Sequence, residues 1–212
     1  MLRKFINILN GIEDKKMFKQ NENALLIIDM QNDFVLPNLP GRFNTAHQIV
    51  PRLQDLLECV RELGWPVFHI VREYREDGSD IENTRLEGFL TKGKAALPGT
   101  EGCEIVKELA PKRGEYRIVK PRFSGFMGTE LDFVLRRYGV INLVVSGTQI
   151  PNCVRATVYD AVSYEYNVTV IEDAISAKSE EVAKANIIDM KNIGVEFQTL
   201  EQFKKGYVQK AA

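Results

Sequence analysis

The sequence predicts a three-layer α/β/α protein, with one parallel sheet and helices packed on both of its faces. Short apolar segments that suit strands alternate with longer segments whose apolar residues recur at helical spacing. The first apolar segment, residues 24–29, is a continuous run, which is typical of a strand covered on both faces. Strands and helices that alternate in this way are joined by right-handed crossovers into a parallel sheet.

Six strands are expected in this sheet. They fall at residues 24–29, 66–71, 116–119, 142–146, 168–173 and 195–199. The first ends in the carboxylate Asp29, and the third is followed by Lys120 and Pro121. In open α/β sheets ligands bind beyond the carboxyl ends of the strands, so both charged residues are expected at the binding edge.

The intervening helices follow amphipathic patterns. They are expected at residues 45–63, 128–138, 151–165, 179–192 and 200–207. Between the second and third strands, residues 72–109 form a long polar stretch with at most one clear helix, near residues 104–109. A loop of that length in a compact domain predicts a lid, a binding loop or an interface arm.

Length and composition favour one domain that acts on a small molecule. The 212 residues fit a domain over residues 21–212, and residues 1–20 are expected to form a short amphipathic helix, with a frayed terminus or a targeting segment as alternatives. A net charge of −1 provides no strong field for nucleic acid or an acidic membrane. No apolar stretch approaches the length of a membrane span. The three cysteines include no CxxC pair, which argues against a disulfide scaffold and favours a reducing compartment, the cytoplasm.

The segment GTQIPNCVRATVYDA, residues 147–161, joins the fourth strand to a helix and places a cysteine at the junction. Gly147 ends the strand, Pro151 suits the first helical turn, and Cys153 follows within that turn. The unpaired N–H groups and the dipole of a helix start favour a thiolate, which is the nucleophilic form of cysteine. A cysteine buried only for packing is the alternative.

Asp29, Lys120 and Cys153 each follow the carboxyl end of a strand, so the fold can bring them together at one edge of the sheet. A thiolate can attack a carbonyl carbon, a carboxylate can take the thiol proton and return it to a leaving amine, and an ammonium group can hold these charges in place. Taken singly, Asp29 could be a loop cap and Lys120 a solvated charge, so the inference rests on their joint placement.

Three motifs resemble those of the isochorismatase-like cysteine hydrolases, the superfamily that includes nicotinamidases and N-carbamoylsarcosine amidohydrolases. LLIIDMQNDF is similar to the first motif and implies a general base at Asp29. IVKPRFSGF is similar to the second and implies a catalytic lysine at Lys120, and GTQIPNCVRATVYDA implies the nucleophile Cys153. The resemblance also implies the strand order 3-2-1-4-5-6, a homo-oligomer (dimer or tetramer) and a cis peptide at Thr148–Gln149. With that peptide, the backbone N–H groups of Gln149 and Cys153 are expected to form the oxyanion hole.

The chain departs from these relatives at two positions that bear on function. Nicotinamidases usually bind a metal through an Asp-x-His pair and a second histidine, but this chain has only His47 and His69, with no carboxylate spaced beside either. We therefore expect two structural histidines, no metal and no other cofactor. Ile150 stands where many relatives have a threonine, so a hydroxyl group near the nucleophile is missing.

The loops at the same edge of the sheet offer candidate substrate contacts. These are Phe34, Arg72, Tyr74, Arg85, Phe123, Phe126 and the side chain of Gln149. The aromatic residues could equally be core, and residues 72–85 could form a subunit interface.

The expected function is metal-independent hydrolysis of a C–N bond, in an amide, ureido or carbamoyl compound, through a covalent acyl-enzyme. Two alternatives stay open. One is isochorismatase-type cleavage of a vinyl ether, and the other is a catalytically silent family member that acts as a binding or scaffold protein.

Overall fold

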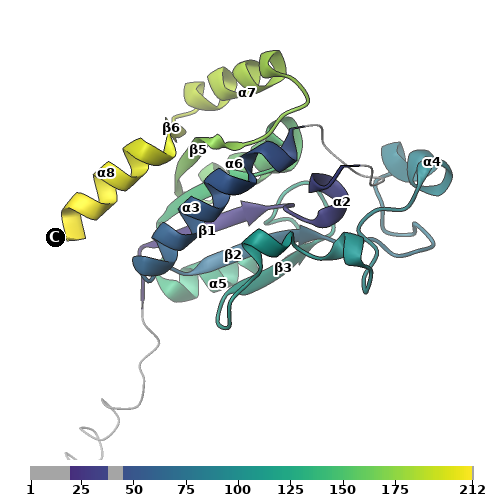
Figure 1. Cartoon of the computed structure of the whole chain (residues 1–212), viewed down its shortest axis with the longest axis horizontal. Coiled ribbons are helices and arrows are strands. Elements are labelled where there is room, and N and C mark those ends of the chain that lie inside the picture. Colours follow the sequence, from purple (N-terminus) through teal and green to yellow (C-terminus); the bar gives the residue numbers. More distant parts are fainter. Residues whose placement is uncertain (1–19, 38–44, 212) are drawn as a thin grey trace, which may run out of the picture.

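The computed structural model describes residues 20–37 and 45–211, with side chains as far as residue 206, so the helix expected within residues 1–20 lies outside the described part except for Gln20. Six parallel strands form one sheet in the order β3-β2-β1-β4-β5-β6 (Figure 1). This confirms the predicted fold class and strand order. The strands are β1 Asn23–Ile28, β2 Val67–Arg72, β3 Tyr116–Lys120, β4 Asn142–Gly147, β5 Asn167–Ile175 and β6 Glu196–Gln198.

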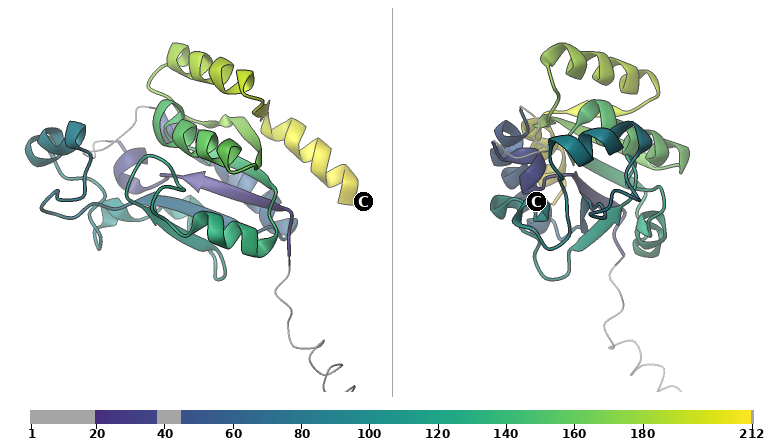
Figure 2. Two further views of the ribbon diagram at one scale, coloured as in Figure 1. Left: turned by 180° about the vertical axis from the view of Figure 1, so that it is seen from behind. Right: turned by 90° about the vertical axis from the view of Figure 1, so that its right-hand side faces the viewer.

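Helices cover both faces of the sheet (Figure 2). They are α2 Asn32–Val35, α3 Val50–Glu62, α4 Asn83–Lys92, α5 Leu131–Tyr138, α6 Arg155–Ser163, α7 Glu180–Asn192 and α8 Leu200–Ala211. Alternate residues of β1 enter two separate cores. Leu26 and Ile28 pack in the core that holds residues of α5, α6 and α7, whereas Leu25 and Ile27 pack in the core that holds residues of α3 and α8. None of the described helices is long and apolar enough to cross a membrane.

The helix expected near residues 104–109 was wrong, because only 3-10 turns form there and a ten-residue helix, α4, forms earlier in the long polar stretch. The apolar pattern of α4 is thin, and Phe89 is its single buried residue. That side chain packs in a third, smaller core, which consists of Phe34, Tyr74, Ile81, Phe89, Ala95 and Ala96. Tertiary contacts rather than a strong helical pattern therefore stabilise this segment, residues 73–100, which we call the arm. In Figure 1 its helix lies beyond the carboxyl ends of the central strands.

Strand β4 pairs directly with β1, in parallel and with Ile28 opposite Gly147, as the sequence predicted. The chain leaves this pair tightly, since the Thr148 N–H donates to the Ile28 carbonyl oxygen at 2.9 Å. Gly147 has a φ of 115°, and a Cβ atom there would lie 2.2 Å from the same oxygen. Only glycine fits at this point, and the fit sets the path of the chain from β4 to Cys153.

Gly147→Ala should therefore unfold the site. We expect the substitution to lower the free energy of unfolding by more than about 4 kcal/mol, because backbone strain and a collision with the Ile28 carbonyl add together. The matched control is Gly114→Ala, at a glycine with a φ of +96° and no atom within 4 Å of the added Cβ. It should cost only the strain, about 1–3 kcal/mol. Urea unfolding monitored by circular dichroism measures both, and equal losses would contradict the proposed collision.

Candidate active site

Asp29 and Lys120 form a buried ion pair across the end of β2. Lys120 Nζ donates to Asp29 Oδ2 at 2.9 Å, and the two residues are 0% and 2% exposed. Lys120 ends β3 and lies opposite Arg72 of β2, so its side chain passes the middle strand to reach the residue that follows β1. The other carboxylate oxygen, Asp29 Oδ1, is buried and has no hydrogen-bond partner at normal distance among the described residues, and the carboxylate lies close enough to the Cys153 thiol to raise its pKa.

Cys153 lies in a turn between β4 and α6. Residues Ile150–Val154 form one π-type turn, so the nucleophile candidate precedes the regular helix instead of lying in its first turn. The Cys153 carbonyl oxygen accepts a hydrogen bond from Thr157 Oγ1 at 2.7 Å, and this hydroxyl oxygen in turn accepts one from the Gly125 N–H at 2.9 Å. The Thr148–Gln149 peptide bond is cis. Ile150 is fully buried in the core around α6, where its apolar side chain fills space.

The environment of Cys153 favours the neutral thiol at rest. Burial raises the pKa of the Cys153 thiol, the Asp29 carboxylate raises this pKa further, and Lys120 and Arg72 oppose both effects. The sequence suggested that the start of a helix would lower the pKa of this thiol. In the structure the opposite effects are larger, because the side chain is only 4% exposed and the Asp29 carboxylate is nearby. A reaction at this sulfur needs a base, and the free oxygen of Asp29 is placed to be one.

Four of the predicted contact residues form one cluster, and Arg72 is the member that reaches Cys153. Arg72 Nη2 lies 3.6 Å from Cys153 Sγ, and its Nη1 donates to Glu82 Oε1 at 2.6 Å. The Arg72 guanidinium also lies over the rings of Tyr74 and Phe123, at 5.2 and 5.5 Å from their centroids. Arg85 stacks on the Phe123 ring at 4.5 Å.

Glu82 is the residue of this cluster that the sequence did not single out. It accepts hydrogen bonds from Arg72 and, at 2.8 Å, from the Tyr74 hydroxyl. Burial raises the pKa of Glu82, but Arg72 and the Tyr74 hydroxyl lower it more, so the side chain is charged at neutral pH. It lies in a polar stretch with many other acidic residues, and no motif or spacing distinguishes it from them.

The other three predicted contact residues, Phe34, Phe126 and Gln149, contact residues outside the Arg72 cluster. Phe34 belongs to the apolar core of the arm. Phe126 stacks near Tyr164 and Tyr166, with ring centroids 5.4 and 5.9 Å away. The Gln149 side chain accepts a hydrogen bond from Asn152 Nδ2 at 3.1 Å.

The two histidines do not offer a metal site in the described part of the chain. His47 is exposed in a 3-10 turn, Ala46–Ile49, and His69 Nε2 lies 3.0 Å from Glu115 Oε2. Burial raises the pKa of Glu115, but hydrogen bonds from Arg61, the Lys112 N–H and His69 hold it at about 2. No three His, Cys, Asp or Glu side chains among the described residues are grouped to hold a metal ion. The donor set therefore does not fit the metal of the nicotinamidases, and no chemical step below involves one.

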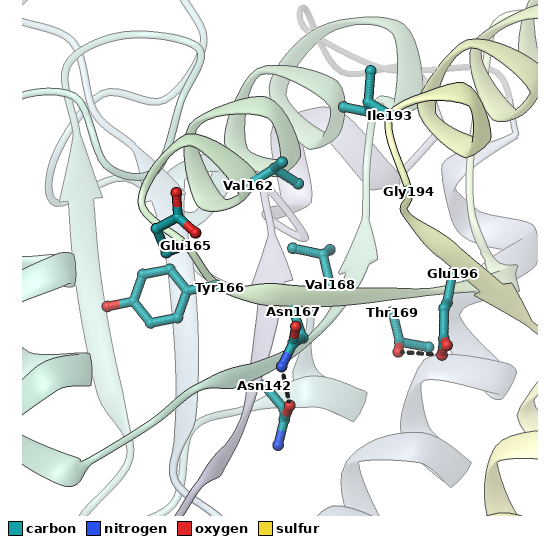
Figure 3. Close-up of a pocket in the computed structure, with 10 residues that line it drawn as sticks. All are labelled: Asn142, Val162, Glu165, Tyr166, Asn167, Val168, Thr169, Ile193, Gly194 and Glu196. Carbon is teal, nitrogen blue, oxygen red and sulfur yellow. Dashed lines mark hydrogen bonds between the residues drawn. The ribbon is translucent and has the colours of Figure 1, made fainter.

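Two hollows lie at different distances from the turn that holds Cys153. A hollow of about 480 Å³ lies near the amino ends of β4 and β5, where Asn167 Nδ2 donates to Asn142 Oδ1 at 2.9 Å (Figure 3). It is at the opposite edge of the sheet from the catalytic candidates. A second hollow, of about 350 Å³, flanks the nucleophile turn and is lined by Phe123, Pro151, Asn152, Arg155, Ala156 and Tyr159. Phe123 thus contacts both this hollow and the Arg72 cluster.

Residues 23–202 match the Isochorismatase domain family. The chain belongs to this family. A protein of Arabidopsis thaliana described as "Probable inactive nicotinamidase" is 43% identical over 183 residues, which cover 85% of this chain and 93% of that protein. An isochorismatase family protein of Desulfovibrio vulgaris has a solved structure that is 48% identical, with a TM-score of 0.84, and the match covers 89% of this chain and 100% of that one. The structure of N-carbamoylsarcosine amidase from Thermoplasma acidophilum is 27% identical, with a TM-score of 0.72 and coverage of 85% and 97%.

These isochorismatase-like hydrolases share the fold and the family of this chain, which confirms the resemblance inferred from its three motifs. These relatives include one protein named as an amidase and one described as probably inactive, so family membership alone does not decide whether this chain turns a substrate over.

Asp29→Asn should lower the pKa of Cys153, because it removes a negative charge beside the sulfur and leaves Lys120 and Arg72 in place. We expect the thiolate to form at a pH about one unit lower or more. The difference in ultraviolet thiolate absorbance between each protein and its Cys153→Ala counterpart measures the midpoint. Lys120→Met is the matched control and should move the midpoint upward. An unchanged midpoint in Asp29→Asn would show that the carboxylate does not control the thiol.

Proposed function

We propose that this protein is a metal-independent cysteine hydrolase that cleaves the C–N bond of a small amide, ureido or carbamoyl compound. The observation that supports it most directly is the placement of a buried thiol beside a carboxylate with one free oxygen, whose other oxygen is held by Lys120. This arrangement contains a nucleophile, a base and a group that orients the base. Membership of a hydrolase family that includes N-carbamoylsarcosine amidase supports the same reaction class.

In the first half of the reaction, Asp29 Oδ1 takes the Cys153 proton as the sulfur attacks the carbonyl carbon. The carbonyl oxygen becomes an oxyanion, which the backbone N–H groups of Gln149 and Cys153 stabilise. The C–N bond then breaks, the nitrogen takes the proton from Asp29, and the amine leaves a thioester on Cys153. Lys120 keeps the carboxylate aimed at the sulfur during both proton transfers.

In the second half, water replaces the amine. Asp29 takes a proton from the water as its oxygen attacks the thioester, the C–S bond breaks, and the sulfur regains its proton. The products are a carboxylic or carbamic acid and the amine, and the enzyme returns to its resting state.

The surroundings support a small substrate with an unsaturated, planar group. The Phe123 ring stacks with the guanidinium groups of Arg72 and Arg85, and Arg72 in turn reaches the sulfur. Planar groups pack well against such surfaces. The adjoining hollow, of about 350 Å³, is at the small end of the usual range for ligand pockets. We also propose a homo-oligomer, as the family resemblance implies, and a reducing compartment such as the cytoplasm, because all three cysteines are free.

A screen of small amides, ureido acids and carbamoyl compounds with ammonia detection tests the function. We expect one class to be hydrolysed, and Cys153→Ala to reduce kcat/KM at least about 1000-fold, since no other group can form the thioester. Circular dichroism of the variant shows that it folds. Isochorismate should be included, because turnover that survives Cys153→Ala would favour vinyl-ether cleavage. No turnover of any compound by a folded, oligomeric protein would favour a catalytically silent role.

Chelation should leave this activity unchanged. Because the described residues do not group metal-binding side chains, dialysis against EDTA and addition of zinc or manganese are expected to change kcat/KM by less than about twofold. The matched control is His69→Gln, which should also leave the metal response flat. Activity that disappears on chelation and returns with one metal ion would contradict the proposed mechanism.

A further inference from the structure

Arg72 is placed at the reacting sulfur more closely than substrate binding alone requires. The residue is 1% exposed, and its Nη2 donates toward Cys153 Sγ at 3.6 Å, within hydrogen-bonding distance for sulfur. No step of the hydrolysis described above uses this contact. The guanidinium is permanently charged in proteins, so a buried cation lies beside the nucleophile throughout the reaction.

We propose that Arg72 is a fourth catalytic residue, whose guanidinium stabilises the Cys153 thiolate at the moment when Asp29 removes the thiol proton. The inference rests on the proposed role of Cys153 as nucleophile and adds a second cation to it. Arg72 supplies a hydrogen bond to the sulfur itself, whereas Lys120 donates to the carboxylate.

The charges around the sulfur balance only when Arg72 is counted. At rest the anions are Asp29 and Glu82, and the cations are Lys120 and Arg72. When the proton moves from Cys153 to Asp29, one negative charge moves from oxygen to sulfur, and the four charges still sum to zero. Without Arg72 the new thiolate would lie in a buried site with an unpaired Glu82, and such unpaired charges are costly. Arg72 therefore keeps the net charge of the buried cluster at zero, both before and after the proton moves.

Hydrogen bonds fix both the backbone and the guanidinium group of Arg72. Gln31 Oε1 accepts from the Arg72 backbone N–H at 2.7 Å, and Gln31 Nε2 donates to the Arg72 carbonyl oxygen at 2.8 Å. At the other end, Glu82 Oε1 accepts from Nη1 while Tyr74 donates to Glu82 Oε2. One nitrogen of the fork is held by the carboxylate and the other points to the sulfur. Glu82 and Tyr74 act through Arg72 and are positioning residues.

The test follows the titration of Cys153 and needs no substrate. The rate of iodoacetamide alkylation at Cys153 is measured against pH, with peptide mapping to separate it from Cys59 and Cys103. The midpoint of the profile reports the pKa of the thiol, whereas the plateau reports access, which any truncation of Arg72 also changes. Burial raises the pKa of Cys59 and raises that of Cys103 to about 11, and it also raises the pKa of Cys153, so the alkylation of each cysteine has to be followed separately.

Two variants carry the measurement. Arg72→Gln leaves Glu82 without its cation, and the double variant Arg72→Gln with Glu82→Gln replaces both charged side chains of the ion pair by neutral ones. We expect both to raise the Cys153 midpoint by about one pH unit, which is about a tenfold loss of alkylation rate below the midpoint. Glu82→Gln alone removes an anion and keeps the cation, so its midpoint should lie below that of the double variant.

The matched control is Arg85→Gln, which removes a guanidinium from the other contact of the Phe123 ring. It should leave the alkylation midpoint unchanged. If Arg85→Gln shifts the midpoint as much as Arg72→Gln, the pKa of Cys153 responds to any nearby positive charge and not to the contact with Arg72, and the inference is overturned. If Arg72→Gln does not fold, Arg72→Lys decides: a lysine keeps the charge but cannot form the fork to both Glu82 and the sulfur, so a partial upward shift is expected.

Failure of this inference is distinguishable from failure of the proposed function. A reactive Cys153 whose midpoint is the same in the double variant overturns the role of Arg72 and leaves the thiol–carboxylate mechanism intact. A Cys153 that is not alkylated in the unaltered protein at any pH, while Cys59 or Cys103 is, overturns the nucleophile assignment and the role of Arg72 with it.

Discussion

The buried ion pair between Lys120 and Asp29 is the interaction on which the rest of the site depends. It joins the carboxyl ends of β3 and β1 across the end of β2 and is almost completely excluded from water. Taking two charges out of water is expensive, and an apolar pair of similar size would often be equally stable, so stability is a weak reason to keep the pair. Its functional consequence is clearer. Lys120 holds one carboxylate oxygen, Oδ2, and the carboxylate lies close enough to Cys153 to raise the pKa of its thiol.

The topology explains why so few residues can build this site. Because β1 and β4 are adjacent in the centre of the sheet, Asp29 and the turn with Cys153 follow neighbouring strand ends at the point where the strand order reverses. Asp29 itself has a φ of 52°, which is uncommon for a residue other than glycine, and such conformations tend to occur at functional sites. The strain at Asp29 and the tight passage at Gly147 lie on the two strands whose ends carry the base and the nucleophile.

The arm connects a peripheral segment to this chemistry. Its small apolar core includes Tyr74 and Phe89, and its Glu82 and Arg85 reach the cluster beside the sulfur. Because the arm supplies Glu82, one of the two anions of the site, it is part of the electrostatics of the nucleophile. Relatives that keep the three sequence motifs but differ in the arm can therefore differ in reactivity.

The sequence by itself determined the sheet, its two covered faces and the three residues at the strand ends. Short apolar runs bounded by turn residues favour strands, and Asp29, Lys120 and Cys153 each lie at or just after the end of such a segment, so local patterns were sufficient to place them at one edge of the sheet. Only the tertiary structure decided the pairing of Arg72 with Glu82, the helix α4 and the protonation state of Cys153. These depend on burial and on contacts between polar residues, and a polar stretch shows neither, since its charges look alike until the fold removes some of them from water. His69 shows the same limit, because its partner Glu115 lies 46 residues away in the chain and reaches it only through the packing of β2 beside β3.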